Sequence, residues 1–425
     1  MKGADGVSFR IPRGTVDIMP GEVETWQYIE EKVRDLCHRC HFSEVRTPIF
    51  EQTDLFRRGV GETTDIVEKE MYTFTDRGGR SLTLRPEGTA SLVRSFVEKK
   101  MYGEPQPTKW YYIGPMYRYE RPQAGRQRQF HQFGVEVFGT TDPGIDAEII
   151  DLGVQFYTSL GLKNVHVELN SVGCHRCRPL YREKLVEFLA PKREELCKDC
   201  QSRLERNPMR ILDCKNESCQ QVTAKAPRMV EHLCEDCASH FEKVQEYLKL
   251  LGVEYRIDTR MVRGLDYYTQ TAFEFTLDGQ GGSLGGGGRY NGLVQEIGGP
   301  EVPGIGFGLG LERTVLALKE QQVDIPVQRG IDLFLIAWGE EPKRRGIPLL
   351  KEIRQAGFSA ERDYLDRKFK GQMKAADRMK ASYVAILGED ELKENRIAVK
   401  HLETGKQETI ELNQLVAYMR QGRCK

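Results

Sequence analysis

Residues 110–139 read WYYIGPMYRYERPQAGRQRQFHQFGVEVFG, and this stretch determines the architecture of the larger part of the chain. Its two ends have the pattern of strands, and they are joined by the loop 121–128. In the second strand, Phe133, Val135 and Val137 lie on one face, because side chains alternate along a strand. We therefore predict an antiparallel sheet with one apolar face.

The opposite face of the same strand is polar. Gln132 and Glu136 lie on it, and Arg118 and Glu120 of the neighbouring strand face them. A polar face of an antiparallel sheet usually lies in water. It also has the residues to line a binding site, and the sequence leaves both interpretations open.

The pattern outside this stretch divides the chain into two parts. Residues 21–40 have the spacing of an amphipathic helix, and residues 71–99 have that of a hairpin followed by a helix. The stretch GIGFGLGLERTVLAL at 304–318 predicts a glycine-rich strand that runs into a helix starting near Leu311. Beyond a linker at 320–330, strands and helices alternate, which predicts an α/β domain with its own sheet.

The predicted fold class is therefore α+β. We expect one domain over residues 1–325, built on an antiparallel sheet and carrying a helical insertion at about 173–250. A second, α/β domain is expected over residues 330–425.

The composition of the 425 residues limits the class of protein. Lys plus Arg and Asp plus Glu each number 63, and this balance excludes a globally basic nucleic-acid coat but not a local basic face. The longest strongly apolar run, residues 331–338, is far shorter than the ~20 residues of a membrane span. The first ten residues lack the apolar stretch of a signal peptide. We expect a soluble cytosolic protein without membrane contact.

Eight of the eleven cysteines fall in the insertion, where even usage would place about two. They form three Cys-x-x-Cys pairs and one wider pair: Cys174 and Cys177, Cys197 and Cys200, Cys214 and Cys219, Cys234 and Cys237. Clustered pairs of this kind in a cytosolic chain more often bind metal than form disulfides. The four pairs together could form two zinc sites of four thiolates each, or two of the pairs could form a single site. The alternative is that the cysteines are reduced and bind no metal.

Three arginines lie where a phosphate group could bind. Arg118 ends a strand, Arg126 lies in a glycine-containing loop, and Arg313 lies in the first turn of a helix. A guanidinium group pairs well with phosphate oxygens, and a helix N-terminus adds backbone donors. Taken one at a time, surface arginines are more often merely solvated.

Five stretches together resemble the histidyl-tRNA synthetases, a family of class II aminoacyl-tRNA synthetases. They cover nearly the whole chain in the order of the family: RTPIFEQTDLF at 46–56, TLRPEGT at 83–89, the stretch at 110–139, RGLDYYTQTAFEF at 263–275 and GIGFGLGLER at 304–313. These stretches include the three class II motifs, and RGLDYY is the most specific match.

The resemblance implies a class II catalytic domain over residues 1–325 that forms a homodimer through the first motif, around Pro48. It implies an enzyme that attaches histidine to tRNA(His) in two steps. Histidine attacks the α-phosphate of ATP, with Mg²⁺ present, to give histidyl-adenylate and pyrophosphate. The 3′-terminal ribose of tRNA(His) then takes the histidyl group, and AMP is released.

The resemblance also implies roles for the arginines. Arg118 would hold the α-phosphate and the histidine carboxylate. Arg126 and Arg313 would bind the β- and γ-phosphates, and Arg263 would add positive charge at the reacting phosphate. Arg118, Arg263 and Arg313 are then the catalytic set, and Arg121 is a candidate contact to the tRNA acceptor end.

A histidine pocket is implied in the same way. Its residues would be Glu87, Gly88, Thr89, Arg118, Gln132, Glu136, Arg263, Tyr267 and Tyr268. Glu136 would accept one imidazole N–H, and the hydroxyl of Tyr268 would contact the other side of the ring. Glu87, Thr89 and Gln132 would bind the α-amino group.

The C-terminal domain resembles the anticodon-binding module of class II synthetases. Residues 362–380 contain seven Lys or Arg against three Asp, which suits an RNA backbone. Tyr364 and Phe369 are candidates for stacking on unpaired bases. A solvated helix face with ion pairs has the same composition.

Two rival functions remain at this level. One is a catalytically inactive, synthetase-like regulatory subunit such as the partner of ATP phosphoribosyltransferase, although such relatives usually lack the anticodon module and part of the arginine set. The other is a zinc-dependent nucleic-acid-binding module, which would explain the cysteines but not residues 83–139.

Overall fold

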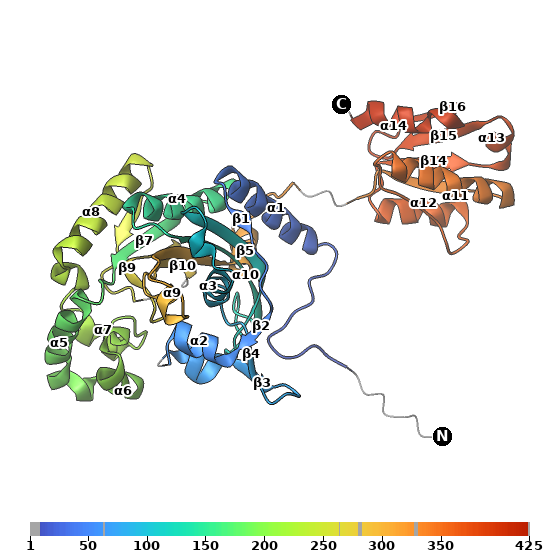
Figure 1. The fold of residues 1–425 in the computed structure, drawn as a ribbon. Coiled ribbons are helices and arrows are strands. Elements are labelled where there is room, and N and C mark those ends of the chain that lie inside the picture. Colours follow the sequence, from blue (N-terminus) through green and yellow to red (C-terminus); the bar gives the residue numbers. More distant parts are fainter. Residues whose placement is uncertain (1–8, 63, 263, 279–282, 327–329, 424–425) are drawn as a thin grey trace, which may run out of the picture. The chain divides into compact units, whose positions relative to one another are not determined.

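The computed structural model describes residues 9–423 except 63, 263, 279–282 and 327–329. The described chain forms two compact units, residues 1–325 and 326–425, and Figure 1 labels their elements. No helix in the described part of the chain is both long and apolar enough to cross a membrane.

An eight-stranded sheet forms the centre of the larger unit. Its spatial order is β1 (Ser43–Glu44), β5 (Thr108–Tyr117), β6 (Gln129–Phe138), β11 (Gly304–Gly310), β10 (Ser283–Arg289), β9 (Thr269–Leu277), β7 (Val165–Ser171) and β8 (Tyr255–Ile257). The six central strands are antiparallel, and the short edge strands β1 and β8 pair in parallel. The two strands predicted within residues 110–139 are β5 and β6, which confirms the predicted hairpin.

Helices and a smaller sheet complete this unit. The small sheet has the order β2 (Phe50–Gln52), β4 (Ser81–Leu84) and β3 (Tyr72–Thr75). The helices outside the insertion are α1 (Val23–Arg39), α2 (Thr53–Val60), η1 (Ile66–Glu70), α3 (Thr89–Glu98), η2 (Met101–Gly103), α4 (Pro143–Ser159), α9 (Leu293–Glu296) and α10 (Leu311–Glu320). The hairpin expected within residues 71–99 and the helices expected at 21–40 and from Leu311 are present.

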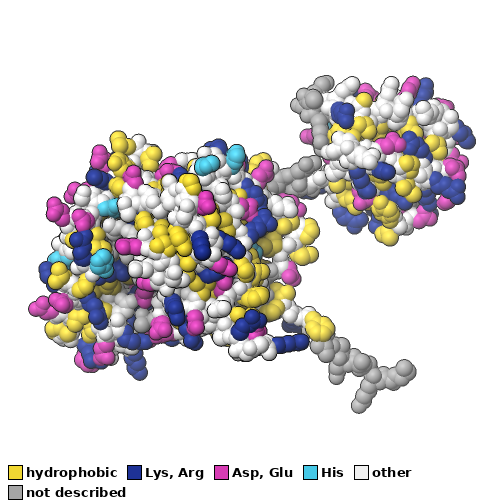
Figure 2. Space-filling view, in the orientation of Figure 1, with side chains coloured by type: hydrophobic (Ala, Val, Ile, Leu, Met, Phe, Trp, Pro, Cys, Tyr) yellow, Lys and Arg dark blue, Asp and Glu magenta, His cyan; other side chains and the backbone are white. Residues whose placement is uncertain are grey.

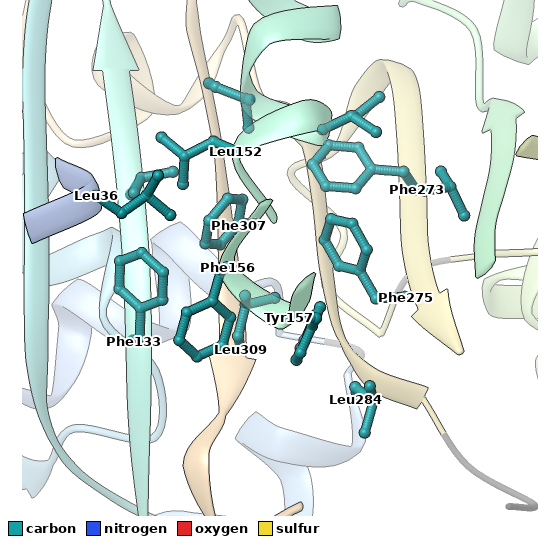
Figure 3. Packing of buried hydrophobic residues seen from close by; sticks show 14 of the residues in the cluster. Leu36, Phe133, Leu152, Phe156, Tyr157, Phe273, Phe275, Leu284, Phe307 and Leu309 are labelled. Atoms are coloured by element: carbon teal, nitrogen blue, oxygen red, sulfur yellow. The ribbon is translucent and has the colours of Figure 1, made fainter. Parts of the chain in front are cut away.

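The apolar face of the large sheet packs against α1, α4 and α10. Phe133 of β6 contacts Phe307 of β11 edge to face, with ring centroids 5.4 Å apart, and it contacts Phe156 of α4 at 5.2 Å. Figure 3 shows these rings clustered with that of Phe275 in the same buried core. Such aromatic burial contributes strongly to stability, and it leaves the other face of the sheet free to carry polar groups.

The insertion is helical, as its sequence predicts. It contains α5 (Cys177–Leu189), η3 (Ala190–Glu195), α6 (Lys198–Arg206), η4 (Pro208–Ile211), α7 (Glu217–Thr223), η5 (Met229–His232) and α8 (Glu235–Leu250). In Figure 1, α5, α6 and α7 lie together at one end of the unit, and α8 leads back towards α4. Four of the eight cysteines are buried in the core of this segment, and the other four are partly buried and pack against it.

The smaller unit is an α/β domain with its own mixed sheet. Its strands have the order β13 (Ala360–Arg362), β12 (Leu333–Ala337), β14 (Tyr383–Leu387), β15 (Arg396–His401) and β16 (Gln407–Glu411). Its helices are α11 (Glu340–Gln355), α12 (Phe369–Arg378), α13 (Glu389–Lys393), η6 (Leu412–Gln414) and α14 (Leu415–Arg423). The alternation predicted beyond the linker is therefore correct.

Candidate functional site

The polar side of the large sheet borders a cavity of about 360 Å³. Residues from η1, β6, β10, β11 and the first turns of α3 and α10 line it. The candidate residues around it are Glu87, Thr89, Arg118, Arg126, Gln132, Tyr267, Tyr268 and Arg313. Residues far apart in the sequence thus meet at one place, and Gln132 on the polar face of β6 lines the cavity.

Three candidates of the described chain do not line the cavity. Glu136 is fully buried beneath the cavity, and Arg121 is exposed outside it. Gly88 does not line the cavity either, and a Cβ at this position would lie 2.3 Å from the ring of Tyr112, so close packing requires glycine there. Arg263 lies outside the described residues.

Arg126 and Arg313 bring two positive charges to one side of the cavity. The loop of Arg126 packs on Arg313, because Gly125 leaves room for the Arg313 side chain. Burial lowers the pKa of Arg313, and the charge of Arg126 lowers it further. Arg313 donates to the carbonyl of Ser283, and Arg126 lies 3.6 Å from Glu120. Two partly buried like charges favour binding of an anion between them.

Arg118 is held by its surroundings before any ligand binds. Its Nε donates to the Pro86 carbonyl at 2.8 Å, and its guanidinium lies 5.3 Å from the ring centre of Phe130. Its Nη1 is 4.0 Å from Glu120, a weak ion pair that leaves donors for a second partner. Arg118 is therefore positioned rather than free to rotate.

Glu87 places a buried carboxylate at the N-terminus of α3. Its oxygens accept from the backbone N–H groups of Thr89 at 2.7 Å and Ala90 at 2.8 Å. Burial nevertheless raises its pKa above the ordinary value. A cationic group bound beside Glu87 would favour its ionised form.

Two hydroxyl groups donate hydrogen bonds to the buried carboxylate of Glu136. Thr89 donates to one oxygen at 2.6 Å, and Tyr290 donates to the other. Burial raises the pKa of Glu136 to about 8. A Cβ at position 306 would lie 2.0 Å from this carboxylate, which explains the glycine of β11 at that point.

Two tyrosines that the sequence did not single out complete the pocket. Tyr112 lines the cavity, and its ring lies between Gly88 and Gly134. Tyr290 contacts Tyr267, with ring centroids 5.7 Å apart, besides donating to Glu136. The only signal for Tyr112 was the alternation of β5, which places it on the same face as Gly114 and opposite Gly134.

The eight cysteines of the insertion form two groups of four. Cys174, Cys177, Cys234 and Cys237 make the outer cluster, and Cys197, Cys200, Cys214 and Cys219 make the inner cluster. Within each cluster all four sulfurs lie within 4.8 Å of one another, and all eight cysteines are free of disulfides.

The spacing of these sulfurs suits a tetrahedral metal ion. The Sγ atoms of Cys174 and Cys177 are 3.6 Å apart, and those of Cys174 and Cys234 are 3.9 Å apart. In the inner cluster, Cys197 and Cys214 are separated by 4.0 Å. A tetrahedral site with Zn–S bonds of ~2.3 Å has sulfurs about 3.8 Å apart.

The basic segment of the smaller unit is partly paired. Arg367 binds Asp363 at 2.6 Å, and Asp366 accepts from Lys343 at 2.6 Å. Tyr364 and Phe369 are exposed by 64% and 44%, so both are available at the surface. Figure 2 shows Lys and Arg interspersed with Asp and Glu on the drawn face of each unit.

Comparisons with known proteins cover both units. A family model described as histidyl-tRNA synthetase matches residues 14–314, and one described as an anticodon binding domain matches residues 333–422. The histidine–tRNA ligase of Anoxybacillus flavithermus is 55% identical over 419 residues, 97% of this chain and 99% of that protein. That of Halalkalibacterium halodurans is 55% identical over 420 residues, 98% of each. The crystal structure of apo histidyl-tRNA synthetase from S. aureus has a TM-score of 0.84 and 45% identity, and it covers 97% of this chain and 100% of that one.

Proposed function

The chain belongs to the histidyl-tRNA synthetase family, and we propose that the cavity described above is where it activates histidine with ATP for transfer to tRNA(His). This assignment rests on one observation: a single cavity has two chemically different sides. Arg126 and Arg313 form a cationic side for phosphates, and Glu87, Gln132 and Tyr268 form a polar side for the amino acid. Residues 1–325 would be the catalytic domain, and residues 330–425 the anticodon-binding domain.

In the first step a carboxylate oxygen of histidine forms a bond to the α-phosphorus of ATP, and the bond to the β-phosphate breaks. Arg118 would hold the carboxylate and the α-phosphate in line, since its guanidinium is already fixed by Pro86 and Phe130. Arg126 and Arg313 would neutralise the pyrophosphate as it leaves. Arg263 would add a further charge at the reacting phosphate. No proton needs to be removed, because the carboxylate is ionised at neutral pH.

Glu87 would bind the α-ammonium group, together with Thr89 and Gln132. The ammonium would stabilise the ionised carboxylate that burial disfavours. Glu136 would accept from the imidazole ring, because each carboxylate oxygen has a lone pair beyond the one used by Thr89 or Tyr290. A pocket that hydrogen-bonds its substrate rejects analogues without the partner by about 10⁴–10⁵.

Class II synthetases use ATP with Mg²⁺, and carboxylates at this cavity fit such an ion. Glu70 and Glu120 both line the cavity. Burial raises the pKa of Glu70, and the charge of Glu120 raises it further, a cost that a divalent cation would relieve. We propose these two groups as its protein ligands, and the bound ion would offset phosphate charge.

In the second step the 3′-terminal ribose of tRNA(His) attacks the carbonyl of the adenylate, and AMP leaves. Arg121 is exposed at the start of the loop 121–128 that carries Arg126, a suitable place to contact the acceptor end. The smaller unit would bind the anticodon, with Tyr364 and Phe369 offering exposed rings for stacking. We propose that this takes place in the cytoplasm.

A homodimer is proposed on the apolar surface next to Pro48. Ile49, Phe50 and Phe74 are exposed by 42%, 50% and 44%, and Phe50 contacts Phe74. Phe50 belongs to β2, which is an edge strand of the small sheet. One apolar patch used twice about a two-fold axis would cover this surface.

We propose further that the insertion binds zinc through its two cysteine clusters. Each cluster offers four thiols at tetrahedral spacing. A small helical segment has a modest core of its own, so a metal ion would stabilise it.

Histidine-dependent exchange of labelled pyrophosphate into ATP tests the proposed activity. Purified protein should catalyse the exchange with histidine and with no other standard amino acid. Addition of tRNA(His) should then yield charged tRNA. A protein that binds histidine without exchange would be a regulatory subunit instead, and this result would refute the proposal.

A further inference from the structure

The two cysteine clusters are nested along the chain. The outer cluster joins the first and last cysteine pairs of the insertion, so it closes the segment where the chain enters and leaves it. The inner cluster joins the two middle pairs. The ions would therefore constrain different parts of the molecule.

The outer cluster is connected to the histidine side of the cavity by α5. Cys177 is the first residue of α5, and Arg178 is the second. Arg178 donates to the carbonyl of Tyr268 and, at 3.1 Å, to that of Val172. A displacement of the cluster would thus move Arg178 and the Tyr268 backbone with it.

A second connection runs through Gln270. Its side-chain Nε2 lies 3.9 Å from the sulfur of Cys237. Its backbone N–H donates to Gly173 at 3.0 Å, and its carbonyl accepts from Val172 at 2.8 Å. The segment that carries Tyr268 is therefore bonded, at Tyr268 and two residues after it, to the chain that enters the outer cluster.

The inner cluster contacts the catalytic unit through α6, whose C-cap Asn207 donates to Asp266 at 3.1 Å, and through two further ion pairs of this helix. Cys200 lies in α6, and from the same helix Arg203 binds Asp65 at 3.0 Å and Arg206 binds Glu68 at 2.7 Å. These acidic groups lie at η1, apart from Tyr268 in the sequence and on a different element. Between the inner cysteines, the backbone N–H of Cys197 donates to the sulfur of Cys219 at 3.3 Å, a bond that lies within the insertion.

The geometry points to a division of labour: the outer zinc ion positions the backbone of the Tyr268 wall of the histidine pocket through Arg178 and Gln270. The inner ion stabilises the insertion and the side-chain contacts of α6 with Asp65, Glu68 and Asp266. This inference rests on the zinc binding and the pocket assignment proposed above. The outer ion is a positioning element that touches no substrate. Small displacements of a positioned group can cost about 10²-fold in rate or affinity.

The test compares single-cysteine variants of the full chain, purified without chelator. Cys237→Ser opens the outer cluster, and Cys219→Ser opens the inner one. Cys40→Ser, at a partly buried thiol outside both clusters, is the matched control. Zinc content, melting temperature and the KM values for histidine and ATP in pyrophosphate exchange are measured for each.

The intact protein should contain about two zinc ions per chain, and each cluster variant about one. Cys237→Ser should raise the KM for histidine by about 10–100-fold and leave that for ATP within about twofold. Cys219→Ser should lower the melting temperature with little change in the KM for histidine. Cys237→His should restore both the second zinc ion and the histidine KM, because imidazole replaces thiolate in such sites.

Arg178→Met provides a measurement that does not depend on the folding of a cysteine variant. It should keep about two zinc ions and still raise the KM for histidine, since it breaks the connection and not the cluster. An unchanged histidine KM in Cys237→Ser despite the loss of one zinc ion, together with an unchanged histidine KM in Arg178→Met, would refute the division of labour alone. A zinc-free intact protein would refute the zinc proposal, and a protein without exchange activity would refute the proposed function.

Discussion

Arg313 packs against the loop that carries Arg126, and both guanidinium groups face one cavity. Burial and the charge of Arg126 together lower the pKa of Arg313. This arrangement is unfavourable in the ligand-free protein and becomes favourable when a polyanion lies between the two groups. The pair therefore lowers the stability of the ligand-free protein and favours the binding of phosphates, a common relation at functional sites.

Replacing one member of this pair should separate activity from stability. Arg313→Gln is expected to lower the rate of pyrophosphate exchange by about 10²–10³. The melting temperature without ligand should stay the same or rise, because a repulsion is removed. Exchange kinetics and calorimetry measure the two effects.

The exposed Arg57, whose nearest acidic partner Asp54 is 3.8 Å away, gives the matched control. Arg57→Gln should change neither quantity. If Arg313→Gln remained folded with full exchange activity, the assignment of this arginine to the phosphates would be wrong.

Glu136 should make the stability of the protein depend on pH. Burial raises its pKa to about 8 in the folded chain, against an ordinary value of 4.5. The folded state therefore holds the proton more tightly, so this stabilisation is present below pH ~4.5 and is lost as the pH rises to about 8. In the Glu136→Gln variant the side chain is neutral at every pH. The melting temperature of this variant should therefore fall less than that of the unchanged protein between pH 5 and 8. Parallel curves for the two proteins would show that Glu136 is ionised throughout.

Much of this architecture could be predicted from local patterns. The alternation in β6 identified which face is polar, and the glycine-rich strand followed by a helix identified β11 and α10. These features depend on residues close together in the sequence, where periodicity and turn chemistry are informative. The arginines of the site were recognisable because the family motifs keep them in order.

The contacts between distant residues could not be predicted in the same way. Tyr290 donates to Glu136 from 154 positions away, and no local pattern indicates such a partner. The pairing of the cysteines was also open, since several combinations fit the spacing of the pairs. Only the fold shows that the first and last pairs meet, because the insertion begins and ends at the same place.

The proposed dimer predicts a specific disruptive substitution. Phe50→Asp would place a charge on the apolar edge of the small sheet, and a two-fold interface would bury it twice. Light scattering should then give a monomer near the chain mass of 48.7 kDa, against a dimer for the unchanged protein.

Leu250→Asp is the control for this substitution. Leu250 is 76% exposed and lies at the end of α8, away from the first motif in the sequence. The Leu250→Asp variant should remain dimeric. A monomer for the unchanged protein at micromolar concentration would contradict the proposed dimer.

Arg289 and Asp146 form a fully buried ion pair between β10 and α4. The Nε of Arg289 lies 2.9 Å and 3.0 Å from the two carboxylate oxygens, and the other nitrogens donate to the carbonyls of Thr140 and Asp142. His240 adds a contact to Asp146 at 3.1 Å from α8. The pair thus joins the sheet to the helix that covers its apolar face.

Arg289→Met should destabilise the larger unit by about 3–5 kcal/mol, because a buried carboxylate and two carbonyls lose their donor. Calorimetry should show a melting transition lowered by roughly 10 °C, at about 2–4 °C per kcal/mol for a unit of this size. The double variant Arg289→Met with Asp146→Leu should recover part of the loss, since it leaves no unpaired charge. Asp146→Leu could instead lower the stability of Arg289→Met by as much as it lowers that of the unchanged protein. The two residues would then act independently, and the ion pair would not be the source of the stability.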